Sequence, residues 1–196
     1  VRAGRWVSEP SWPSPNVTGR VMALNADGLA DEAGPEQARH VAAPATLGHA
    51  TLIWCNSGDG SPEFPGDQRP DDALSLCFDS SPLAEDLAIL GAPVAHLEIA
   101  ADRPLALVSV RLSEVLPDGT SALISYGLLN LTHRDSHEDI TFLEPGKRYG
   151  VDVVLNDAAH VFAAGSRIRV AVANGFASKG VKFVAGHFCS GSSIPA

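Results

Sequence analysis

From Ala73 onward, apolar and polar side chains alternate with a period of two residues, most clearly over residues 108–113 and again over 149–155 and 168–172. Side chains that alternate in this way lie on opposite faces of an extended strand. Pro117-Asp118-Gly119 predicts a tight turn, because proline presets φ and glycine accepts a positive φ, and the return strand would run over residues 121–130. Short strands separated by turns predict an all-β chain folded as an antiparallel β-sandwich or barrel.

Residues 1–72 differ in composition from the rest of the chain, because proline and glycine recur throughout them. Frequent prolines and glycines exclude long helices and long central strands, so this part is interpreted as an extended arm that packs on the sandwich. Two short strands are predicted within it, over residues 20–24 ahead of Asp27-Gly28 and over residues 50–55. Further along the chain, Ser81-Pro82 followed by Glu85 and Asp86 also allows a short helix.

The net charge of −9, from 23 acidic and 14 basic residues, argues against nucleic acid and against anionic membranes as partners. A hydrophobic fraction of 45% predicts a packed core. The three cysteines, Cys55, Cys77 and Cys189, share no C-x-x-C spacing, which favours free thiols and a cytoplasmic location. Cys77 stands between Leu76 and Phe78 and is expected to be buried, protonated and unreactive.

One charged cluster is the main site candidate. Alternating signs at Asp67, Arg69, Asp71 and Asp72 favour an ionic network that pins the arm to the sandwich. Calcium binding is the alternative, although the spacing does not match an EF-hand loop. We therefore expect no bound metal and no cofactor.

Two further groups of residues can be interpreted either as a chemical site or as a structural feature. Residues 133–139 contain Ser136 between two histidines and several acids, but neighbours on one loop point apart and cannot converge as a catalytic triad. The spacing of His133 and His137 would suit zinc only on a helical turn, so a solvated loop is favoured. The three tryptophans could form a sugar-stacking platform, but buried anchors for the arm are favoured for Trp6, Trp12 and Trp54.

Nucleophile and cofactor motifs are missing from the sequence. Gly119-Thr120-Ser121-Ala122-Leu123 comes nearest to the G-x-S-x-G elbow of hydrolases and fails at its last position. Phosphate loops and dinucleotide fingerprints do not occur. No catalytic residue is therefore expected in this chain.

An ordered set of short strings resembles the C-terminal domain of the cocaine-esterase and Xaa-Pro dipeptidyl-peptidase hydrolases, the CocE/NonD family. The resemblance runs from about Arg5 to Asn174 and rests on Trp12-Pro13, Asp67-Gln68-Arg69, Phe78-Asp79-Ser80-Ser81-Pro82-Leu83, Gly127-Leu128-Leu129-Asn130-Leu131-Thr132-His133-Arg134, Leu143-Glu144-Pro145-Gly146 and Gly165-Ser166-Arg167-Ile168-Arg169-Val170.

The resemblance implies a jelly-roll, galactose-binding-like β-sandwich over residues 73–174, with residues 81–86 extended. It also implies an upstream α/β-hydrolase domain that carries the Ser-Asp-His triad, and a contribution to a homodimer contact. From residue 175 the pattern is lost, so residues 175–196 are interpreted as a divergent tail of the kind that a truncated or frameshifted gene would give. A free-standing carbohydrate- or ligand-binding sandwich is the alternative.

Overall fold

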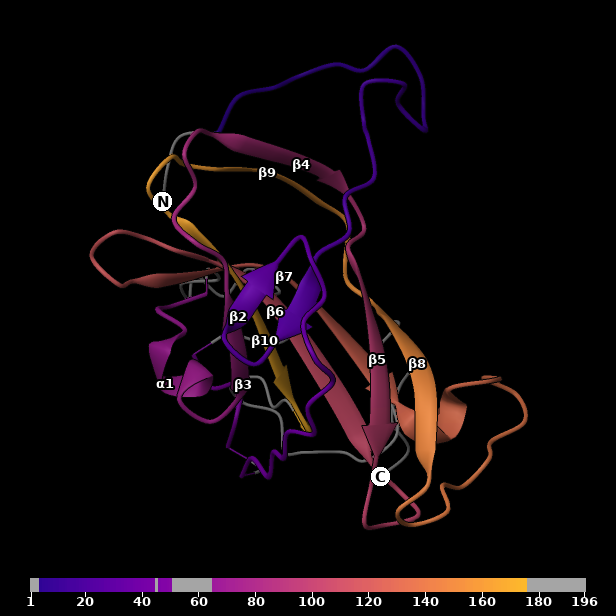
Figure 1. The fold of residues 1–196 in the computed structure, drawn as a ribbon. Helices are drawn as coiled ribbons and strands as arrows, with labels where there is room; N and C mark the ends of the chain where they lie inside the picture. Colours follow the sequence, from indigo (N-terminus) through magenta and orange to yellow (C-terminus); the bar gives the residue numbers. More distant parts are fainter. Residues whose placement is uncertain (1–3, 45, 51–64, 176–196) are drawn as a thin grey trace, which may run out of the picture.

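The strands of this chain form two packed layers, as Figure 1 shows in a computed structural model that describes residues 4–44, 46–50 and 65–175. The predicted jelly-roll β-sandwich is confirmed. The elements, in chain order, are β1 (Ala23–Asn25), β2 (Gly28–Ala30), α1 (Arg69–Asp72), β3 (Leu76–Asp79), β4 (Leu87–Gly91), β5 (Val94–Ala100), β6 (Leu107–Val115), β7 (Ser121–Asn130), η1 (Leu131–His133), β8 (Arg148–Val154), β9 (Ala158–Phe162) and β10 (Arg167–Ala173).

The first layer is a four-stranded antiparallel sheet in the order β3-β10-β6-β7. The predicted hairpin is present as β6 and β7, which pair from Leu107 opposite Asn130 to Val115 opposite Ser121. Gly119 closes its turn with a φ of 86°, a conformation that side chains with a Cβ rarely adopt. Strand β10, the last of the described strands in chain order, lies between β3 and β6.

The second layer is a long antiparallel ribbon with a bend in each of its two legs. Strands β4 and β5 form one leg, and β8 and β9 form the other, so that β4 pairs with β9 and β5 pairs with β8. The Leu155 amide donates to the Pro93 carbonyl at 2.8 Å across the bend. Along β5 and β8 the side chains alternate between core and solvent, as the sequence pattern predicts.

The core lies between the apolar faces of the two layers. Strand β6 contributes Val108, Val110 and Leu112, and the ribbon contributes residues such as Val153 and Phe162. The two layers meet closely at Gly127 of β7, because a Cβ at this position would lie 2.5 Å from the Val154 carbonyl oxygen. Glycine is therefore required where β7 passes the bend of the ribbon.

The arm differs in detail from its sequence prediction. Its first strand covers Ala23–Asn25 and turns through Ala26 and Asp27 into β2, rather than occupying residues 20–24. The strand predicted over residues 50–55 lies outside the described residues except for Ala50, which is in a turn. Residues 81–86 form no helix: the Leu83 amide and carbonyl bond to Ser166 and Gly165, and the chain bends at Ala84 and Glu85 before it enters β4. Among the described residues, no helix is long and apolar enough to cross a membrane.

Candidate functional site

An ionic cluster joins α1 to the polar face of the four-stranded sheet. The Asp72 carboxylate accepts one hydrogen bond from Arg111 of β6 and one from Arg169 of β10, each at 3.0 Å. Arg169 also forms two hydrogen bonds of 2.6 Å to both oxygens of Asp79 on β3. Asp72 therefore bridges two arginines, and the network links α1 to three strands of the sheet.

Burial makes this cluster an internal feature of the fold. Arg111 is 1% exposed, and Asp71 and Asp72 are 3% and 6% exposed. Strand β6 is buried on both faces, since the ribbon covers one face and the α1 segment covers the other. Buried charges persist only when they are paired, and here Arg111 is paired with Asp72 through Nη2, while its Nε and Nη1 atoms are buried without a hydrogen-bond partner.

The four residues predicted as one ionic cluster occupy two separate places. Asp71 and Asp72 lie in the buried network, where Asp71 accepts a hydrogen bond from the Ala50 amide at 3.0 Å. Arg69 and Asp67 form an exposed pair of their own at 2.5 Å. The cation beside Asp71 and Asp72 is Arg111, not Arg69.

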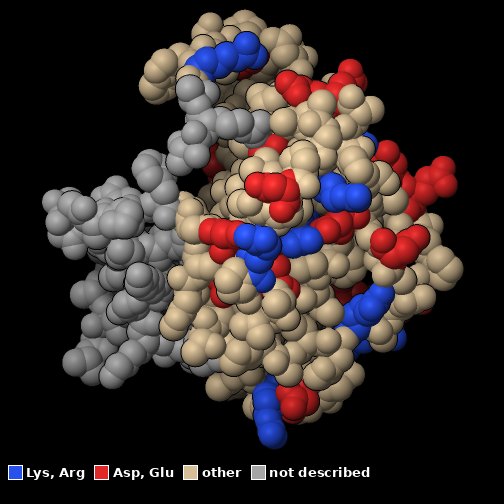
Figure 2. Space-filling model, turned by 90° about the vertical axis from the view of Figure 1, so that its left-hand side faces the viewer, with Lys and Arg blue, Asp and Glu red and all other residues tan. Residues whose placement is uncertain are grey.

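Arg111 and Arg169 were missed as site residues because their distance from Asp72 in sequence conceals the contact. The available signal was the occurrence of Arg111 and Arg169 in the middle of strands whose other residues are mostly apolar or small. Hydrogen bonding to Asp79 raises the pKa of Arg169 further, so this guanidinium stays charged. Figure 2, which faces the α1 side of the molecule, shows acidic and basic side chains interleaved there.

Cys77 is the one free cysteine among the described residues, and the prediction that it is buried was wrong. Its side chain extends from the polar face of β3 at the edge of the sheet, opposite Ala171. Its thiol nevertheless donates to the Asp72 carbonyl at 3.4 Å. Loss of hydration, aided by the nearby Asp72 carboxylate, raises the pKa of Cys77 to about 11.

The loop over residues 134–142 is built as a structural connection. The Ser136 hydroxyl accepts hydrogen bonds from the amides of Glu138 and Asp139, at 3.1 and 3.0 Å. Arg134 stacks over the ring of Tyr149 at 4.4 Å and donates to two backbone carbonyls. No group of three or more metal-ligating side chains occurs among residues 4–44, 46–50 and 65–175.

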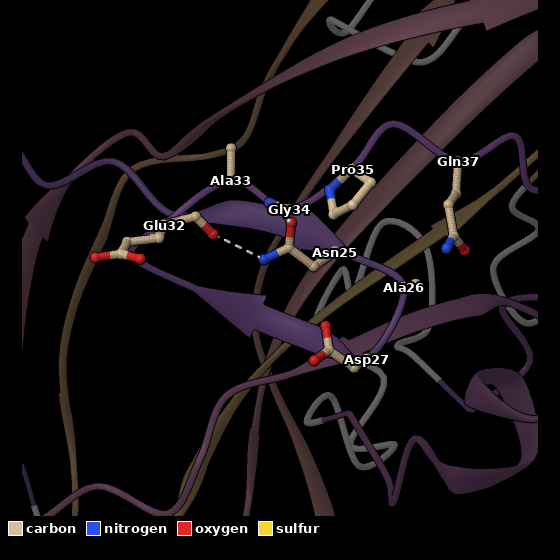
Figure 3. Close-up of a pocket in the computed structure, with 8 residues that line it drawn as sticks. All are labelled: Asn25, Ala26, Asp27, Glu32, Ala33, Gly34, Pro35 and Gln37. Carbon is tan, nitrogen blue, oxygen red and sulfur yellow. Dashed lines mark hydrogen bonds between the residues drawn. The ribbon is translucent and has the colours of Figure 1, made fainter.

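A shallow hollow lies beside the β1–β2 hairpin (Figure 3). The Asn25 side chain crosses it, donating to the Glu32 carbonyl at 2.8 Å and accepting from the Gly34 amide at 2.7 Å. The amide is therefore occupied in holding residues 32–34 against the hairpin. The hollow has no unpaired buried polar group that would select a ligand.

The most unusual surface feature is the N-terminal part of the arm, residues 4–21. Twelve large apolar side chains are exposed in the described part of the chain, and five of them fall in this short segment: Trp6, Val7, Trp12, Val17 and Val21. The prediction that Trp6 and Trp12 are buried anchors was wrong, since they are 103% and 67% exposed. Trp54 lies outside the described residues.

Comparison with known families decides what kind of domain this is. Residues 1–180 match the family described as the X-Pro dipeptidyl-peptidase C-terminal non-catalytic domain. The chain belongs to this family. The match includes the arm together with the whole sandwich, so this family of non-catalytic domains accounts for the fold of all the described residues.

Similar proteins are hydrolases that are much longer than this chain. Cocaine esterase from Rhodococcus sp. (strain MB1 Bresler) is 27% identical over 189 residues, which are 86% of this chain and 32% of the esterase. An aminopeptidase from the marine sediment archaeon Thaumarchaeota archaeon aligns with a TM-score of 0.73 at 22% identity, over 88% of this chain and 31% of its own. A CocE/NonD family hydrolase from Staphylococcus aureus aligns with a TM-score of 0.62 at 16% identity, over 87% and 31%.

The chain thus spans about a third of the length of the relatives that it matches. The two structural alignments establish the shared fold of this X-Pro dipeptidyl-peptidase C-terminal domain. About two thirds of the cocaine esterase lies outside the region that matches this chain.

Proposed function

We propose that this chain is the C-terminal domain of a serine hydrolase of the esterase or Xaa-Pro dipeptidyl-peptidase type. In this proposal it packs on an α/β-hydrolase domain and shapes the mouth of its pocket, while the nucleophile, base and oxyanion hole lie in that other domain. The single observation that carries the proposal is the match of residues 1–180 to a non-catalytic domain family. The length of the cocaine esterase, about three times the matched region, supports it.

A free-standing carbohydrate-binding module is less well supported. Such a module would present a row of aromatic side chains on one face of a sheet. The exposed tryptophan and phenylalanine side chains of the described residues are Trp6, Trp12 and Phe142, and all three lie outside the strands. Their position favours contact with another protein domain over sugar binding.

The proposal is tested in two steps. The genomic DNA around this reading frame is sequenced, and the hydrolase region so identified is expressed with and without residues 1–196. Hydrolysis of a nitrophenyl ester and of an alanyl-prolyl anilide is then measured, together with thermal unfolding. We expect the hydrolase region to lose thermal stability, and kcat/KM to fall, when residues 1–196 are removed. Equal activity and stability with and without them would refute the proposed role.

Three finer assignments belong to the same proposal. We infer that the domain consists of an arm over residues 1–72, a sandwich over 73–174 and a divergent tail over 175–196. We also infer that it contributes to a homodimer, for which sedimentation of the full hydrolase is the test. Its cytoplasmic location, inferred from the free cysteines, is tested by cell fractionation.

A further inference from the structure

Residues 4–21 present an apolar surface that the other described residues leave exposed. Trp6 is fully exposed, and Val21, Trp12, Val7 and Val17 are 84%, 67%, 62% and 43% exposed. Single exposed apolar residues are common on proteins, but their concentration in one short segment marks an interaction surface. In Figure 1 this segment, drawn in indigo, projects beyond β4 and β9.

The segment has a defined local structure, which argues against a passive tail. The Glu9 carboxylate accepts hydrogen bonds from the Ser14 hydroxyl at 2.5 Å and from the Asn16 side-chain amide at 2.8 Å. The backbone amide of Asn16 donates to the Ser14 hydroxyl at 3.1 Å, and the backbone amide of Val17 donates to the Ser14 carbonyl at 3.2 Å. These bonds link Glu9 to Ser14 and Asn16 and so close a loop that contains Trp12.

Trp12 also lies close to the sandwich. Its Cη2 atom is 3.7 Å from the position that a Cβ on Gly91, at the end of β4, would occupy. The tip of the indole is therefore near the end of β4, while two thirds of the residue stays exposed. A large exposed aromatic side chain offers much apolar contact area to a partner, and tryptophan is enriched among interface hot spots for this reason.

We propose that residues 4–21 form the docking strap by which this domain binds the α/β-hydrolase domain, with Trp6 and Trp12 inserted into apolar hollows of that domain. The inference rests on the function proposed above. The relatives' additional length supports this occupant, since it supplies a domain large enough to cover the strap. Arg5 and Glu9 place one charge of each sign beside the two tryptophans, as in the polar rim of an interface.

The test measures binding between two separate polypeptides, residues 1–196 and the hydrolase region identified from the genomic sequence. The strap variant carries Trp6→Ser and Trp12→Ser. The control carries Val94→Ser and Val154→Ser, which remove an exposed apolar pair, 43% and 60% exposed, from the β5–β8 ribbon. All residues changed are exposed, so thermal unfolding should remain as in the wild type, and this is checked first.

We expect the strap variant to bind about 100-fold more weakly than the wild type and the control to bind within about threefold of it. In a Trp54→Phe background, binding should shift the tryptophan emission of the strap to shorter wavelength and protect it from acrylamide quenching. Equal binding of the strap variant and the wild type would overturn the strap while leaving the proposed function in place. Failure of the wild type to bind the hydrolase region would overturn the proposed function itself. Self-association of residues 1–196 that the strap variant abolishes would assign the strap to a second copy and overturn this proposal.

Discussion

The Asp72 carboxylate holds together the polar face of the four-stranded sheet, because two arginines from different strands share it. The hydrogen bonds of Arg111 to Asp72 and to the Ser75 hydroxyl both come from Nη2, each at 3.0 Å. Arg111 Nη1 lies 3.9 Å from an Asp71 oxygen, and neither Nη1 nor Nε has a hydrogen-bond partner. The hydrogen bonds of this guanidinium thus come from one nitrogen, Nη2, whose place a lysine ammonium could take.

Replacing Arg111 by methionine should lower the free energy of unfolding by about 3 kcal/mol, because it leaves a buried carboxylate short of one partner. Arg111→Lys should lose less, since a lysine ammonium can still donate to Asp72. Arg69→Met is the matched control and should change stability little, as Arg69 pairs with Asp67 at the surface. Urea unfolding measures all three variants. Equal losses for the Arg111 and Arg69 methionine variants would show that the buried network is not the stabilising one.

Cys77 should react slowly with thiol reagents at neutral pH although it is exposed, because its pKa of about 11 leaves very little thiolate. Iodoacetamide labelling of a Cys55→Ser, Cys189→Ser variant should rise with pH and reach its half-maximum near 11. The folded state favours the protonated thiol, so its stabilising effect is complete below the ordinary pKa of 9.0 and is lost as pH rises through about 11. A labelling midpoint at or below 9.0 would contradict this assignment.

The sequence was sufficient to select Asp71 and Asp72 but not their partners. Arg111 and Arg169 lie 39 and 97 residues from Asp72, and pairing of that range depends on the order of strands in the sheet. The side of Cys77, by contrast, follows from alternation alone. Leu76 and Phe78 lie on one face of β3, Phe78 packs against the core, and Cys77 between them therefore faces away from it.

Among the elements, the β6–β7 hairpin was the most predictable, because its strands and its turn are adjacent in the sequence. The helix α1 was not predicted, since Pro70 and the two acids suit the first turn of a helix but only tertiary contacts retain so short a segment. The bend of the ribbon also depends on residues that are distant in the sequence. At the bend, the Asn156 amide lies 3.0 Å from the Tyr126 carbonyl, and this contact brings the ribbon against β7.

Gly127→Ala tests this contact between elements. Its Cβ would meet the Val154 carbonyl oxygen at 2.5 Å and the Leu155 Cα at 3.1 Å, so that backbone must move. We expect a loss of about 1 to 3 kcal/mol in the free energy of unfolding. Gly150→Ala on β8 serves as the control, because nothing lies within 4 Å of its Cβ position. Unfolding curves that coincide for the two variants would disprove the close approach.

For the molecule as a whole, we expect that residues 1–196 alone do not hydrolyse a nitrophenyl ester or an alanyl-prolyl anilide. Acyl transfer needs a nucleophile, a base and an oxyanion hole in one place. Ser136, the most suggestive serine in the sequence, instead accepts two backbone hydrogen bonds in its own loop. Any rate should lie about a million-fold or more below that of an enzyme. Turnover that a serine-directed phosphonate blocks, and that His137→Ala leaves intact, would reveal a nucleophile elsewhere in the chain.

The position of β10 has a consequence for how the chain is made. The ribosome releases β3 and β6 long before residues 167–173, yet β10 is the strand that joins them. Until it emerges, β3 has no partner in the sheet and Asp72 lacks Arg169.

Nascent chains stalled before Arg167 should therefore be cut readily by protease, and chains stalled well after Ala173 should resist it. Equal resistance in both would mean that the hairpin and ribbon fold without their central strand. On this view the four-stranded sheet forms in one late step, when β10 inserts between β3 and β6.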